Sequence, residues 1–76
     1  MLEIIKNQIQ MLNNYSTAKY GLYQAYGKVQ LVRLYENGGQ RGITGFCPKP
    51  ELNRILSAMI TYAAIEQCEK NAWHFL

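Results

Sequence analysis

The sequence contains no aspartate and a single histidine, His74, which stands third from its end. General acid–base catalysis needs positioned His, Asp or Glu side chains, and the five acidic residues are glutamates that fall mostly on predicted helix surfaces. Cys47 and His74 could supply a nucleophile and a base, but no third residue is evident that would orient the base. We therefore expect that the chain is not an enzyme.

Cysteine is also scarce, since Cys47 and Cys68 are the only two and stand twenty-one positions apart. A structural metal site usually takes four ligands at short spacings, and a phosphate-binding loop ends in Lys followed by Ser or Thr. Neither pattern occurs, so we expect no metal and no cofactor. No apolar run approaches the roughly 20 residues that span a bilayer, and no cleavage signal follows the N-terminal segment. We expect a cytoplasmic protein with both thiols reduced.

Positive charge is in only slight excess, because eight Lys and Arg residues and five Glu residues give a net charge of +3. That excess suits nucleic acid, an acidic protein surface or no special partner. Apolar and sulfur-containing residues make up 49% of the 76 residues, which is a globular composition. We expect one domain over residues 1–76, with a core so thin that a partner or a second copy can contribute to its stability.

An amphipathic helix is predicted from Leu2 to about Asn13. Apolar residues recur at the helical period of 3.6, at Leu2, Ile5, Ile9 and Leu12. The polar run 13–17 then competes for backbone hydrogen bonds and ends the helix.

The middle of the chain predicts a three-stranded antiparallel meander, because it is rich in β-branched and aromatic residues and contains all six glycines, which interrupt these segments. A turn at Gly27-Lys28 would pair Leu22 with Arg33. A second turn at residues 37–40 would place Glu36 opposite Arg41, Leu34 opposite Ile43 and Leu31 opposite Phe46.

Two prolines end the sheet, and Pro50 with Glu51 suits a helix start. This second helix is predicted to run from Pro50 to about Asn71. Its apolar face is Leu52, Ile55, Leu56, Met59, Ile60, Tyr62 and Ala63. The expected fold class is α+β, in the order αβββα.

Both faces of the predicted sheet are apolar, which a meander with one solvated face does not require. The members of one face are Tyr20, Leu22, Tyr26, Val29, Leu31, Tyr35 and Phe46. Those of the other are Tyr23, Ala25, Val32, Leu34 and Ile43. Either the two helices cover opposite faces, or they share one face and the other carries scattered apolar groups, or one face is left open to a partner or a second copy.

The C-terminal end is apolar as well. Polar residues enter the core side of the second helix after Ala63, so we expect its last two turns to project beyond the sheet. The end then either folds back on the core or anchors an interface, a role that Trp and Phe suit.

These features predict a small, non-catalytic binding inhibitor or adaptor that docks on a larger protein or nucleoprotein complex. Small phage or mobile-element proteins that inhibit bacterial defence, anti-CRISPR proteins among them, share this profile. The candidate contact residues are Tyr20, Tyr23, Tyr26, Arg33, Tyr35, Arg41, Trp73 and Phe75. The alternatives are a nucleic-acid-binding protein that uses the basic, tyrosine-rich sheet face, and a homodimeric structural subunit.

Overall fold

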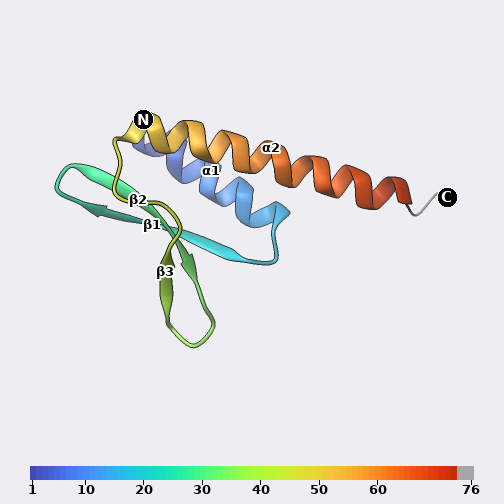
Figure 1. The fold of residues 1–76 in the computed structure, drawn as a ribbon, viewed down its shortest axis with the longest axis horizontal. Helices are drawn as coiled ribbons and strands as arrows, with labels where there is room; N and C mark the ends of the chain where they lie inside the picture. The colour runs from blue at the N-terminus through green and yellow to red at the C-terminus, as the bar shows by residue number, and fades with distance from the viewer. Residues whose placement is uncertain (74–76) are drawn as a thin grey trace.

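The computed structural model describes residues 1–73, with side chains as far as Cys68, and has the expected αβββα order (Figure 1). The elements are α1 (Leu2–Tyr15), β1 (Lys19–Ala25), β2 (Lys28–Leu34), β3 (Gln40–Gly42) and α2 (Lys49–Trp73). The strands form one antiparallel sheet in the order β1-β2-β3. The predicted α+β meander is confirmed.

Helix α1 ends where its polar run begins to bond elsewhere. The Ser16 amide still donates to the Leu12 carbonyl at 3.1 Å, while the Ser16 hydroxyl accepts from the Ala18 amide at 3.1 Å. The Asn13 side chain forms two hydrogen bonds with the backbone of Tyr20 at the start of β1. Its oxygen accepts from the Tyr20 amide at 2.8 Å, and its nitrogen donates to the Tyr20 carbonyl at 3.1 Å. These bonds fix the first strand against the end of the helix.

The two helices run side by side in the same direction on one face of the sheet (Figure 1). Gln8 donates to the Ser57 hydroxyl at 3.0 Å, and Gln67 donates to the Tyr15 carbonyl at 3.2 Å, so residues later in α1 meet residues later in α2. Apolar side chains of both helices, of β2 and of the β3–α2 connection form the core: Ile5, Ile9, Leu12, Val29, Leu31, Cys47, Leu52 and Leu56.

The first hairpin turns one residue earlier than predicted. Ala25 pairs with Lys28, so the turn is Tyr26-Gly27, and Leu22 lies opposite Leu31 instead of Arg33. Both turn residues have positive φ, 56° and 70°, as a type I′ hairpin requires. The predicted pairing was wrong by two residues, which leaves the paired side chains of β1 and β2 on their predicted faces because strand side chains alternate. Tyr26, which was predicted on the face of Tyr20, lies instead in the turn.

The register of the second hairpin differs more from the prediction. Leu34 pairs with Gln40, and Arg33 with Arg41, so Glu36 does not face Arg41. The Tyr35 amide donates to the Gly39 carbonyl at 2.9 Å and closes a shorter loop than predicted. The amides of Ile43 and Thr44 then both approach the Leu31 carbonyl, at 2.8 and 3.4 Å, which interrupts regular pairing before Val29 and Cys47 form one further antiparallel bridge.

The two faces of the sheet are therefore distinct. The inner face, toward the helices, consists of Tyr20, Leu22, Val29, Leu31, Arg33 and Arg41. The outer face consists of Tyr23, Gln30, Val32 and Leu34, extended by Phe46, whose ring packs edge-on against Tyr23. The prediction that Phe46 shares a face with Tyr20 was wrong, because the second hairpin has a different register.

Val32 is buried although it lies on the outer face, away from the helices. A Cβ on Gly21 would lie 3.2 Å from the Leu34 side chain, and one on Gly42 would lie 2.5 Å from the Gln30 amide nitrogen. Leu34 and Gln30 therefore lean over glycines on the neighbouring strands and cover Val32 between them. The outer face has a small apolar cluster of its own, which explains why both faces are apolar.

Helix α2 extends beyond the sheet, as its sequence predicted, and also past the end of α1 (Figure 1). Leu52 and Leu56 are fully buried, but Tyr62 is 66% exposed, so its predicted place on the packed face was wrong. No helix among the described residues is long and apolar enough to cross a membrane.

Candidate functional site

A row of three side chains crosses the open end of the inner face. Tyr20 of β1 lies opposite Arg33 of β2, and Arg33 lies opposite Arg41 of β3. Like charges that face each other directly across strands destabilise a sheet. We call these three residues the arginine row, and all three were predicted as contact residues.

Tyr35 fixes the orientation of one guanidinium. The Arg33 Cζ lies 5.2 Å from the centre of the Tyr35 ring, within the range of a cation–π contact. Arg33 also lines a hollow of about 380 Å³ between the α1–β1 connection and the end of β2, together with Lys19 and Glu36. Three cations, Arg33, Arg41 and Lys19, and the Glu36 carboxylate thus lie near the C-terminal end of β2.

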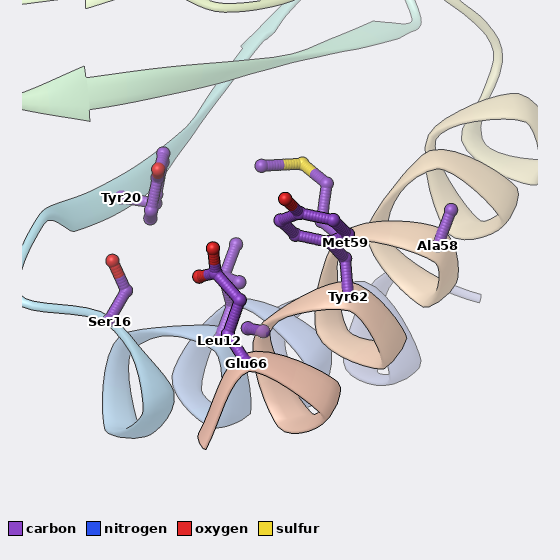
Figure 2. A pocket seen from close by; sticks show the side chains of 8 residues that line it. Leu12, Ser16, Tyr20, Ala58, Met59, Tyr62 and Glu66 are labelled. Carbon is purple, nitrogen blue, oxygen red and sulfur yellow. The ribbon is translucent and has the colours of Figure 1, made fainter. Parts of the chain in front are cut away.

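A larger, mostly apolar hollow of about 490 Å³ lies between α1, α2 and the start of β1 (Figure 2). It is lined by Leu12, Ser16, Tyr20, Ala58, Met59, Tyr62, Ala63 and Glu66. Tyr20 belongs both to this hollow and to the arginine row. The two features therefore adjoin on the inner face.

The outer face offers a different surface: it carries an aromatic pair, and the register also places Lys19, opposite Leu34, and Lys28, opposite Ala25, on this face. The rings of Tyr23 and Phe46 are 5.8 Å apart and inclined by 64°, and these two residues are 48% and 43% exposed. Leu34 is 44% exposed on the same face. Edge-to-face aromatic pairs of this kind are favourable beyond the area they bury.

The predicted contact residues are thus divided among several places. Tyr23 lies on the outer face, whereas the arginine row and Tyr35 lie at the open end of the inner one. Tyr26 stands in the β1–β2 turn and is 96% exposed. Only the backbone of Trp73 is described, at the end of α2, and Phe75 lies outside the described residues.

Leu34, Phe46 and Glu66 were not among the contact residues predicted from the sequence, although they lie on the two candidate surfaces. Leu34 and Phe46 had been assigned to faces, but the wrong register for β3 separated Phe46 from Tyr23. Glu66 had been recognised as a polar residue on the core side of its helix. Glu66 is exposed and lines the hollow, so its polar side chain does not enter the core.

The thiols differ in surroundings. Burial raises the pKa of the Cys47 thiol, the nearby Glu51 carboxylate raises it further, and a hydrogen bond with Thr44 partly offsets both effects. Cys47 is thus an unreactive core residue, whereas Cys68 is exposed. No group of three His, Cys, Asp or Glu that could hold a metal occurs in the described part of the chain.

Comparison with protein families, with curated proteins and with solved structures finds no match to this chain.

Proposed function

We propose that the chain is a non-catalytic binding protein that docks on a larger protein or nucleoprotein complex as an inhibitor or adaptor, with its outer sheet face as the contact surface. The observation that supports this proposal is the half-exposed Tyr23–Phe46 pair, which shares the face away from both helices with Leu34. Apolar patches on small proteins commonly mark interaction sites.

The outer face is also organised in advance of binding. Leu34 and Gln30 are held over Gly21 and Gly42, and the Gln30 side chain donates to the Thr44 carbonyl at 2.8 Å. Side chains that are already ordered lose less conformational entropy on association. The aromatic rings combine large contact area with few rotatable bonds, as residues that dominate protein interfaces do.

The small size and the poor catalytic inventory of the sequence support an inhibitory role over an enzymatic one. A blocker needs only a rigid surface that competes for a site on its target. Phage and mobile-element proteins that inhibit bacterial defence, such as anti-CRISPR proteins, are one class with these properties, and we propose it as the class to test first.

The test is affinity capture from the cells that encode the protein, with wild-type, Tyr23→Ala and Tyr15→Ala chains as baits. Tyr15 is the matched control, because it is 39% exposed on α1, away from the outer face. We expect a partner that is retained by the wild type and by Tyr15→Ala but is lost with Tyr23→Ala, since loss of a central aromatic residue costs about 2 kcal/mol or more.

Equal retention by all three baits would contradict the assignment of the outer face. Sedimentation of the purified protein tests the alternative of a homodimeric subunit. A dimer that dissociates on Tyr23→Ala substitution would identify a second copy as the occupant of this face.

Nucleic acid is the second candidate, and the stacked Arg33–Tyr35 pair next to Arg41 favours it. It predicts binding of an oligonucleotide that weakens steeply as salt rises, because bound phosphates release counterions. However, Tyr23 and Phe46 lie on the face opposite Arg33 and Arg41, so bases stacked on those rings would be distant from the two arginines.

A further inference from the structure

The open end of the inner face carries two arginines that have no carboxylate opposite them in the sheet. Arg33 and Arg41 are directly opposed across β2 and β3, and Lys19, which the register places on the outer face, borders the hollow that Arg33 also lines. The only acidic residue that lines that hollow is Glu36. Because opposed like charges cost stability, an anionic group bound between them would relieve the repulsion.

Next to these cations lies the apolar hollow, and Tyr20 connects the two. Tyr20 lines the hollow and lies opposite Arg33 on the same face. Adjacent strands are about 4.8 Å apart, so the backbones of Tyr20 and Arg41 are separated by about 10 Å, the length of about three residues of extended chain. A single peptide segment can therefore occupy the apolar hollow and contact the arginines at the same time.

Glu66 determines which part of this surface can take an anionic group. Its carboxylate faces into the hollow (Figure 2), so an acidic group there would be repelled. The hollow accordingly suits an uncharged apolar group, and the arginines suit the anion. A nucleic-acid strand, with a phosphate at every nucleotide, would carry charge past Glu66, whereas a peptide can alternate apolar and acidic residues.

We propose that the inner face binds an acidic peptide segment of a partner protein. One large apolar side chain fills the hollow beside Tyr20 and Met59, and an Asp or Glu about three residues away pairs with Arg33 and Arg41. The guanidinium of Arg33, held over Tyr35 at 5.2 Å, has the planar donor geometry that matches a carboxylate. This surface is separate from Tyr23 and Phe46, so it does not depend on the outer-face contact.

Fluorescence anisotropy with labelled peptides tests the proposal on the full chain. The main probe is a peptide in which a phenylalanine is followed by three glutamates, and it is compared with a peptide in which serine replaces the phenylalanine, a peptide with lysines in place of the glutamates, and oligothymidylate. We expect the first peptide to bind, and each peptide replacement to weaken binding by about tenfold or more, as loss of an apolar anchor or of a charged hydrogen bond does.

Two matched protein variants locate the site. Arg41→Gln should weaken binding of the phenylalanine–glutamate peptide by about tenfold, whereas Arg54→Gln, the same change at an exposed position of α2, should leave it unchanged. Thermal melts monitored by circular dichroism check that both variants fold.

Three results would overturn the proposal. Absence of binding to the phenylalanine–glutamate peptide at low salt would exclude an acidic ligand. Equal affinity for the serine peptide would exclude the hollow. Tighter binding of oligothymidylate than of any peptide, with loss on Arg41→Gln substitution, would assign the arginines to nucleic acid instead.

Discussion

Replacement of Arg41 by glutamate should stabilise the fold, because it converts a repulsive pair across β2 and β3 into an attractive one. Opposed residues of an antiparallel pair have Cβ atoms about 5 Å apart. Two unit charges about 6 Å apart in water interact by about 0.7 kcal/mol, and salt at physiological strength roughly halves that value. The change from repulsion by Arg33 to attraction should therefore raise the free energy of unfolding by about 0.5–1 kcal/mol.

Urea denaturation followed by circular dichroism measures this gain, and a gain of 1 kcal/mol corresponds to about 4–8 °C in Tm for a domain of this size. Arg41→Gln should give about half the effect, since it only removes the repulsion. Lys28→Glu is the control with the same change of charge, because Lys28 lies opposite the uncharged Ala25. Stability that is unchanged or lower in Arg41→Glu, or a gain that persists undiminished at high salt, would refute the charge argument.

Three further predictions concern the rest of the fold. Tyr26→Asn should raise the free energy of unfolding by about 1 kcal/mol in urea, because asparagine tolerates the positive φ of the turn better than tyrosine. Leu56→Ala should lower it by about 2–5 kcal/mol, since the side chain is fully buried in the core. Iodoacetamide should modify Cys68 in the folded protein and Cys47 only after unfolding, as peptide mass spectrometry would show. Because the folded state holds the Cys47 proton more tightly, stability should also fall as the pH rises above the pKa of the unfolded thiol.

Element order could be predicted from the sequence because each element has a clear periodicity. The spacing of Ile5, Ile9 and Leu12 fits only a helix, and Pro50 with Glu51 marks the next helix within one residue of its observed start at Lys49. These signals are local, and nothing in the tertiary packing opposes them.

Strand register could not be predicted, because two turns of similar length satisfy the same sequence. Gly27 can serve as the first or the second residue of its turn, and propensity alone does not favour a tyrosine with φ of 56° before it. In the second hairpin, the expected Glu36–Arg41 pair was outweighed by the Tyr35–Gly39 hydrogen bond and by the Asn37 side chain, which accepts from the Gly39 amide at 2.9 Å.

That second error had consequences for the candidate site. The predicted register placed Phe46 with Leu31 and gave Arg41 an acidic partner, so the sequence indicated one mixed surface of arginines and tyrosines. The observed register instead places Phe46 with Tyr23 on one face and opposes Arg41 to Arg33 on the other. Two separate surfaces result, one with the Tyr23–Phe46 pair and one with the opposed arginines, and each has its own chemistry.

The two ends of β2 both carry features that lower stability. Tyr26 adopts a left-handed backbone that costs a non-glycine residue about 1–2 kcal/mol, and Arg33 faces Arg41 at the other end, about 20 Å away along a seven-residue strand. At that separation the gains from Tyr26→Asn and Arg41→Glu should add. A single substitution removes each of these two costs. Selection for stability alone would therefore not retain Tyr26 or Arg41. If the doubly substituted protein is more stable yet loses its partner, contact explains why these residues are present; if it is more stable and binds as before, neither residue takes part in contact.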